Sequence, residues 1–261
     1  MQHIRQRNQV LVLIISLMLV TAACGDGAGP ATTSAPPATA APTTAAPITT
    51  TTTAASTAEP TRQLCQPSDP ACIGPLAPGT HTTARLLIPV TFEVPEGWSK
   101  TLDVPGSLEL VLEGFPSGTV GIRPDWAIAD QERCTSNSEP GLGRTVDDLV
   151  SFLTEHPGLI TSTPEPVILG GLEGQRLDVR KDLAWSGPCP GRVSLFTHQG
   201  TINDPGWWDI YDYWQFRLYF LDAGDDHTVT VHIDTTDEAS FEGFVGAAMP
   251  IVEAFQFGAT P

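Results

Sequence analysis

Two stretches of strict alternation near the end of the chain constrain its fold most. Apolar side chains occupy every second position in WQFRLYFLD at 214–222 and in TVTVHID at 228–234, which is the period of a half-buried β-strand. The intervening AGDDH at 223–227 contains glycine and aspartate, which favour turns. The sequence therefore predicts a β-hairpin. The residues expected to share a face within each strand are Trp214, Phe216, Leu218 and Phe220 on the first, and Val229, Val231 and Ile233 on the second.

Shorter alternating segments predict the remaining strands. The glycines Gly170, Gly171 and Gly174 form a glycine-rich stretch between two of these segments. This stretch lacks the lysine of a Walker loop and the spacing of a dinucleotide fingerprint, so it predicts a hairpin turn. The predicted strands are 90–94, 107–114, 119–123, 166–169, 175–181 and 192–197.

Two segments predict helices. Thr145 and Asp148 have the spacing of a capping box at the start of 145–156. Thr235 and Glu238 are expected to cap a second helix, which Pro250 interrupts or kinks. Sequential strands with two helices imply an α+β domain, an antiparallel β-sheet with two or more helices packed on it. The apolar faces expected are Val146, Leu149, Val150 and Leu153 in the first helix, and Phe241, Phe244, Val245 and Ala248 in the second.

The other end of the chain has the form of an export signal. A basic start is followed by an apolar run at 10–20, shorter than the roughly 20 residues of a spanning helix. The run ends in VTAAC, which resembles a bacterial lipobox, whose cysteine receives a diacylglycerol thioether. Residues 1–23 are therefore expected to be a lipoprotein signal peptide, and Cys24 a lipidation site that carries fatty acyl chains such as palmitate. The alternative is an ordinary signal peptide cleaved near Ala23, since Thr21 stands where strong lipoboxes have leucine.

The composition of the next segment predicts a linker. Threonine, alanine and proline dominate residues 27–63, where no aromatic residue occurs. Such a segment cannot bury enough apolar area to offset the entropy lost on ordering. We expect residues 24–78 to hold the lipidated N-terminus, this disordered linker and a small cysteine loop. Residues 79–258 are expected to form a single globular domain.

Charge narrows the range of partners. The formal net charge is −17, and removal of residues 1–23 takes away two arginines and no acid, which gives −19. Nucleic acids and anionic membranes repel such a protein, so no nucleic-acid partner is expected. The lipid at Cys24 would then hold the protein at the extracytoplasmic face of the cell membrane.

The remaining four cysteines are an even number, as expected for two disulfides in an oxidising compartment. Of the three connectivities, we favour Cys65–Cys72, which closes the local loop CQPSDPAC, together with Cys134–Cys189. The rival interpretation is a zinc site, but the spacing lacks the usual ligand pairs.

No metal site and no cofactor are expected. Asp222, Asp225 and Asp226 surround Gly224 and could hold calcium, yet the EF-hand pattern is missing, so turn chemistry explains them better. The six histidines form no HExxH motif, and no GxSxG motif occurs. His232 shares its strand face with polar residues, so it is expected to face solvent.

A resemblance to a known family rests on short motifs. The pattern F-x-V-P-x-G-W from Phe92 to Trp98 resembles the early strand and turn of PsbP-like domains in bacterial lipoproteins of the LpqN type. The helix after Thr145, the VILGGLEGQRLDV hairpin and the terminal helix are similar in order, over about residues 80–258. The lipobox and linker resemble those of actinobacterial secreted lipoproteins. The resemblance implies an envelope-attached α/β sandwich without recognised catalysis.

One segment stands out as a candidate binding site. PGWWDIYDYWQF at 205–216 holds three of the six tryptophans and two of the three tyrosines. Aromatic rings beside carboxylates can stack on sugars whose hydroxyls the carboxylates bind, and an exposed aromatic patch also suits a protein partner. The alternative is that the tryptophans fold over the end of the sheet. The candidate binding residues are Trp207, Trp208, Asp209, Tyr211, Asp212 and Tyr213.

These observations predict a membrane-anchored, extracytoplasmic lipoprotein that is not an enzyme. It would bind a cell-wall carbohydrate, a lipid or an envelope protein. One alternative is an envelope hydrolase acting on cell-wall carbohydrate, with Asp209 and Asp212 roughly 5–10 Å apart in a cleft. The other is an accessory scaffolding lipoprotein without a small ligand.

Overall fold

The computed structural model describes residues 63–83, 85–86, 88–135, 137–198 and 207–258, without the side chains of His198 and Trp207. These residues belong to one compact unit. The expected signal peptide, Cys24 and the linker at 27–62 lie outside the described residues. No helix in the described part is long and apolar enough to cross a membrane.

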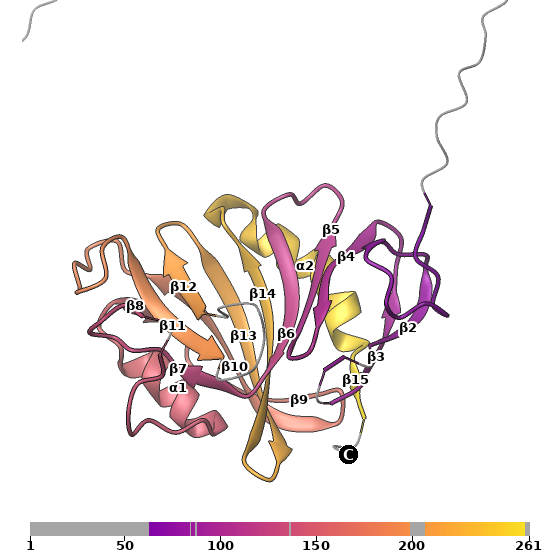
Figure 1. Ribbon diagram of the computed structural model, residues 1–261. Coiled ribbons are helices and arrows are strands. Elements are labelled where there is room, and N and C mark those ends of the chain that lie inside the picture. Colours follow the sequence, from indigo (N-terminus) through magenta and orange to yellow (C-terminus); the bar gives the residue numbers. More distant parts are fainter. Residues whose placement is uncertain (1–62, 84, 87, 136, 199–206, 259–261) are drawn as a thin grey trace, which may run out of the picture. The chain divides into compact units, whose positions relative to one another are not determined.

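A nine-stranded antiparallel sheet forms the centre of the unit (Figure 1). The strand order is β1-β4-β5-β6-β14-β13-β10-β8, and β9 also pairs with β10. The predicted hairpin is confirmed as β13 and β14, which pair along nearly their whole length. The bounds are β1 Gly74–Pro75, β4 Trp98–Val104, β5 Ser107–Leu112, β6 Gly118–Pro124, β8 Leu159–Thr161, β9 Glu165–Leu169, β10 Leu172–Lys181, β13 Gln215–Gly224 and β14 His227–Thr235.

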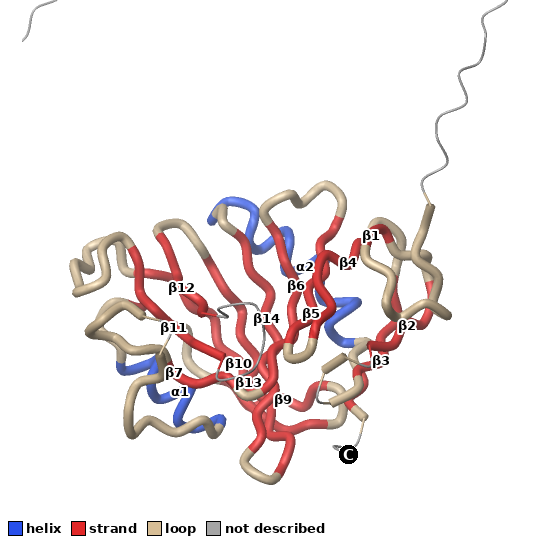
Figure 2. The backbone as a smooth tube through the Cα atoms, in the orientation of Figure 1, coloured by secondary structure: helices blue, strands red, loops and turns tan. Residues whose placement is uncertain are grey.

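Further elements pack on both faces of the central sheet (Figure 2). Helix α2 (Phe241–Glu253) packs on one face beside a three-stranded sheet in the order β15-β3-β2. Helix α1 (Val146–Glu155) and a second three-stranded sheet, β12-β11-β7, cover the other face. The α+β prediction is thus confirmed for the sheet and its two helices, while the two extra sheets are an addition. Their strands are β2 Gly79–Thr83, β3 Val90–Val94, β7 Trp126–Ile128, β11 Arg192–His198, β12 Trp207–Tyr211 and β15 Gln256–Phe257.

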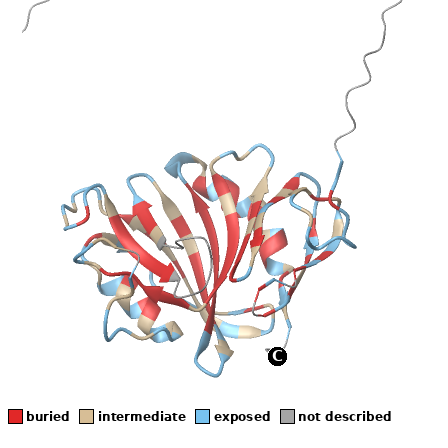
Figure 3. Cartoon of the chain, in the orientation of Figure 1, coloured by how far each residue is buried: buried red, intermediate tan, exposed pale blue. Residues whose placement is uncertain are grey.

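Alternate side chains of β13 and β14 contribute to two separate hydrophobic cores, one on each face of the sheet. Val231 and its alternate neighbours on β14 point toward α2, whereas Leu218 and its alternate neighbours on β13 point toward α1. Leu218 lies directly opposite His232, and opposite residues of an antiparallel pair share a face. The polar row of β14 therefore faces α1 and is buried, as the red central strands of Figure 3 show.

The expectation that His232 faces solvent is wrong. Its exposed fraction is 0%, because the sheet formed by β7, β11 and β12 covers the face that alternation assigns to water. Alternating apolar side chains identify the strand face that packs on one core. They do not reveal whether another sheet covers the opposite face, which carries the polar side chains.

The helix starts follow local hydrogen bonding. Thr145 and Asp148 form the predicted capping box, with Oδ2 of Asp148 accepting from the Thr145 N–H at 3.1 Å. The second cap was placed wrongly: Asp237 accepts from the Ala239 N–H and opens a short 3₁₀ turn (Glu238–Ser240) before α2. Pro250 lies inside α2 and does not end it, although proline cannot donate the backbone hydrogen bond to the carbonyl four residues earlier.

Both predicted disulfides are present, Cys65–Cys72 and Cys134–Cys189. The smaller loop is part of the folded unit, because β1 pairs with β4 and Leu76 is buried in the α2 core. Lys100 of β4 also donates from Nζ to the Pro70 carbonyl, 2.5 Å away. The cysteine loop therefore packs within the same compact unit as the strands that follow it.

Candidate functional site: an acidic groove

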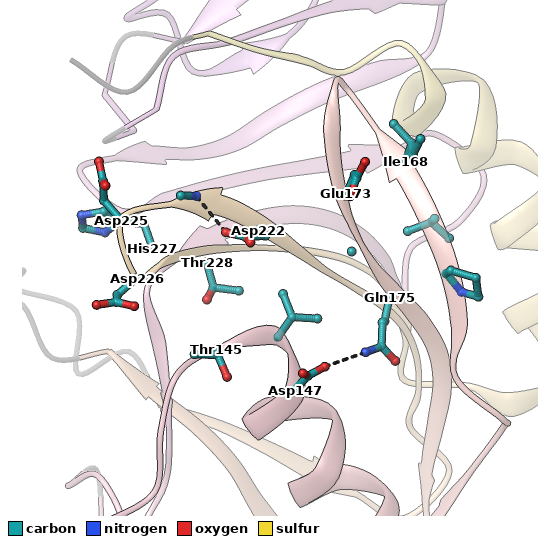
Figure 4. A pocket seen from close by; sticks show the side chains of 15 residues that line it. Thr145, Asp147, Ile168, Glu173, Gln175, Asp222, Asp225, Asp226, His227 and Thr228 are labelled. Carbon is teal, nitrogen blue, oxygen red and sulfur yellow. Dashed lines mark hydrogen bonds between the residues drawn. The ribbon is translucent and has the colours of Figure 1, made fainter.

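The α1 face of the main sheet is covered only in part. Beyond the first turn of α1, side chains of β9, β10, β13 and β14 form the floor of a groove of about 820 Å³ (Figure 4). That volume lies within the usual range for ligand sites. The groove is thus an open stretch of sheet, bounded by the start of α1 and by the β13–β14 turn.

Strand register explains which side chains reach the groove. Ile168 of β9 lies opposite Glu173 of β10, so the two share the α1 face. Asp222 lies opposite Thr228 at the ends of β13 and β14. The turn that follows adds Asp225 and Asp226 with φ angles of 51° and 63°, a left-handed conformation that aspartate tolerates better than most residues.

The groove is strongly acidic. No lysine or arginine is among its described lining residues, and none of its carboxylates is ion-paired in the described part of the chain. Clefts lined by one sign of charge concentrate field lines and attract counter-charges. The carboxylates are those of Asp147, Glu173, Asp222, Asp225 and Asp226.

Two of these carboxylates are held in place by hydrogen bonds. Gln175 donates from Nε2 to Oδ1 of Asp147 at 3.0 Å, which links β10 to the start of α1. Oδ1 of Asp222 accepts from the Gly224 N–H at 2.8 Å. Both are dashed in Figure 4. These bonds fix part of the negative charge in position.

An apolar strip accompanies the charges. Val146, Pro166 and Ile168 line the same groove, and Ile168 is 73% exposed, the largest value for any bulky apolar residue described. An exposed apolar side chain inside a concavity indicates contact with a ligand or partner. The groove therefore suits a ligand that carries both positive charge and aliphatic surface.

The sequence indicated three segments that line this groove, but it did not predict that they lie together. The capping box at Thr145, the Gly170–Gly174 hairpin and the Asp222–Asp226 turn were each explained by local turn chemistry. The fold brings the three together. Among the described residues, no three His, Cys, Asp or Glu side chains are grouped so that they could hold a metal ion.

The predicted aromatic site is divided by the fold. Trp208 turns inward, with its ring centroid 4.5 Å from that of Trp126. Asp209 is buried and accepts from the Ser194 hydroxyl at 2.9 Å. Trp207 has no described side chain. Trp208 thus packs against Phe216 and His232 of the central sheet. Asp209 is the next residue along β12, so its side chain points to the opposite face of that strand.

The outward half of the segment is a turn between β12 and β13. Tyr211 and Tyr213 are exposed, and Asp212 forms an ion pair with Lys181, with 2.6 Å between Oδ1 and Nζ. Asp209 instead pairs with Arg192 at 3.2 Å. Since Asp209 is buried and Asp212 is exposed, the two carboxylates do not face a common cleft, and the hydrolase alternative loses its acid–base pair.

A buried polar cluster lies beneath Trp208. Nδ1 of His232 is 2.8 Å from Oδ1 of Asp234. Burial lowers the pKa of His232 well below its ordinary value, with a smaller contribution from Arg123, and burial raises the pKa of Asp234 well above its own. The ring packs on Gly121, where an added Cβ would come within 1.9 Å of Nε2. Nε2 therefore faces the neighbouring strand rather than a cleft.

Comparisons with known proteins give little further guidance. No protein-family model matches the chain, and no curated protein matches it. A crystal structure from Bacteroides thetaiotaomicron VPI-5482 aligns with 9% identity and a TM-score of 0.29, over 64% of this chain and 44% of that one. The solution structure of cyanobacterial PsbP (CyanoP) from Synechocystis sp. PCC 6803 aligns with 10% identity and a TM-score of 0.32, over 64% and 86%. Both scores are below 0.5, so neither structure assigns a function here.

Proposed function

We propose that this chain is a non-catalytic, lipid-anchored binding protein at the extracytoplasmic face of the cell membrane. Its acidic groove binds a basic peptide segment of an envelope protein. One observation carries the proposal: five carboxylates, none of them ion-paired within the described part of the chain, line the same groove as the exposed side chain of Ile168.

The chemistry of the groove selects the partner. Lysine and arginine combine a cationic head with an aliphatic stem, so one such side chain can satisfy a carboxylate and cover Ile168 together. Exposed ion pairs contribute about 0.2–1 kcal/mol each, so useful affinity requires several basic residues. A basic peptide supplies them at the right spacing, whereas a single small cation does not.

Neutralising two groove carboxylates is expected to weaken this binding. The double variant Asp226→Asn/Glu173→Gln removes two exposed charges without changing side-chain size. Its dissociation constant for an oligolysine peptide should rise roughly three- to tenfold, because two surface ion pairs are lost. Isothermal titration calorimetry of the full chain at about 0.1 M ionic strength measures this change.

A matched control separates the effect of removing charge from the groove from the effect of lowering the net charge of the protein. Glu96→Gln/Glu132→Gln removes the same charge from exposed sites outside the groove, and charges more than about 10 Å away are largely screened. Its affinity should stay within about twofold of the parent chain. Equal weakening in both double variants would show only a general attraction to an acidic protein.

The anchor is tested at Cys24. Cells that produce the parent chain and are fed labelled palmitate should yield a labelled protein in the membrane fraction. Cys24→Ala should lose the label and be released from the membrane, because acyl chains supply the membrane affinity. An unlabelled parent chain, or a variant that keeps the label, would contradict a lipid at this residue.

We extend the proposal to the family and to the compartment of the protein. The resemblance to PsbP-like domains of LpqN-type actinobacterial lipoproteins fits an exported domain on a linker. The two disulfides fit an oxidising compartment. A scaffolding role remains the second candidate, favoured by the openness of the groove to a second protein chain.

A further inference from the structure

Tyr213 has a backbone conformation that its side chain disfavours. It is the third residue of the turn Tyr211–Trp214, which the Trp214 N–H closes by donating to the Tyr211 carbonyl at 3.3 Å. Its φ is 68°. At the third position of a β-turn, a positive φ favours glycine or asparagine, and a bulky residue there is an outlier.

The other described non-glycine residues with positive φ have a local explanation. Asp125, Asp225 and Asp226 are aspartates, whose short polar side chains tolerate this region. Cys134 is tied to Cys189 by a disulfide. Tyr213 has neither a short polar side chain nor a disulfide bond, so its positive φ requires a different explanation.

No polar or ring contact within the described part of the chain offsets the strain at Tyr213. The residue is 61% exposed, and among the described residues it takes part in no hydrogen bond, ion pair or ring contact. Replacement by glycine would relieve the strain and lose little packing. A strained residue that the surrounding structure does not use is a reason to look for function.

The neighbours of Tyr213 hold the turn through a ring contact and an ion pair. Tyr211 is 39% exposed, and its ring centroid lies 5.1 Å from that of Trp214. The Asp212 carboxylate is 49% exposed and is held by Lys181, whose own side chain is only 5% exposed. The turn therefore displays aromatic rings next to a fixed carboxylate. We call these four residues, Tyr211 to Trp214, the aromatic ledge.

We propose that the aromatic ledge is a second binding site, separate from the acidic groove, and that it takes a neutral saccharide. The apolar C–H face of a pyranose ring would stack on Tyr213, and its hydroxyls would donate to the outer oxygen of Asp212. An anionic sugar polymer is disfavoured by the net charge of −17. A protein partner is disfavoured because one turn offers far less than the roughly 800 Å² per partner of a stable interface.

Calorimetry with neutral tetrasaccharides tests this proposal. The full chain, in a detergent without sugar headgroups, is titrated with cellotetraose and with the tetramer of N-acetylglucosamine. Binding of at least one is expected. Tyr213→Gly should weaken it about tenfold or more, while Tyr213→Phe, which keeps the ring, should retain most of it.

Two further readouts separate function from folding. Tyr213→Gly should melt at the same temperature as the parent chain or higher, since glycine suits the turn. It should also bind oligolysine as the parent does, because the groove lies elsewhere. Absence of tetrasaccharide binding by the parent chain, unchanged binding by Tyr213→Gly, or a lower melting temperature of that variant would overturn the proposal.

Discussion

Replacing Asp103 by alanine is expected to lower the free energy of unfolding by about 3–5 kcal/mol. Its Oδ2 atom lies 2.8 Å from Nζ of Lys100, and both side chains are at most 5% exposed. Oδ1 accepts from the Thr83 hydroxyl at 2.8 Å. Alanine would leave the Lys100 ammonium buried with only the Pro70 carbonyl as a described partner, and desolvating an uncompensated charge is costly.

Urea unfolding curves of the parent chain and of the variant measure this difference. The double variant Lys100→Met/Asp103→Leu is the control, because exchanging both charges for apolar groups of similar size often costs little. It should recover most of the lost stability. A loss below about 1 kcal/mol in the single variant would mean that water reaches the pair.

Removal of the Cys134–Cys189 disulfide is expected to cost about 4 kcal/mol. The bond joins residues 55 apart, and the chain entropy that a crosslink removes from the unfolded state grows with loop length. The Cys65–Cys72 bond joins residues only 7 positions apart in the sequence. By the same dependence on loop length, its removal should cost about 2 kcal/mol. The double variants Cys134→Ala/Cys189→Ala and Cys65→Ala/Cys72→Ala isolate the two effects.

Denaturant curves under non-reducing conditions compare these variants directly. The ranking is the sharper test, since strain and residual structure affect absolute values. A larger loss for the Cys65–Cys72 variant would contradict the loop-length explanation. It would point instead to the contacts of the cysteine loop with β4, which include the bond from Lys100 to Pro70.

The sequence predicted the elements of this fold better than its layers. The period of two in β13 and β14 and the capping box at Thr145 are local signals, and each was confirmed. Alternation in β14 reports one apolar row, yet both rows are buried, because a sheet distant in sequence covers His232. Which strand face receives a second layer depends on tertiary packing, and no local pattern encodes it.

For the candidate site, too, the local features were predictable from the sequence and their arrangement in space was not. Asp225 and Asp226 at the β13–β14 turn, and Gly170 and Gly171 at the β9–β10 turn, were recognised correctly as turn residues. Gly174 and Asp222, expected to belong to the same turns, lie within β10 and β13. Their convergence with the start of α1 depends on the strand order, in which β10 lies beside β13. The aromatic segment does not form one site, because Trp208 lies in β12 and packs on Trp126, whereas Tyr213 lies in the turn after β12 and is exposed.

Photo-crosslinking tests the acidic groove most directly. An oligolysine peptide that carries a benzophenone is irradiated with the full chain at low ionic strength, and crosslinked fragments are identified by mass spectrometry. The proposal predicts crosslinks in residues 145–147, 166–175 and 222–228, which high salt suppresses. Crosslinks spread over the acidic surface, or concentrated outside these segments, would contradict the groove as the binding site.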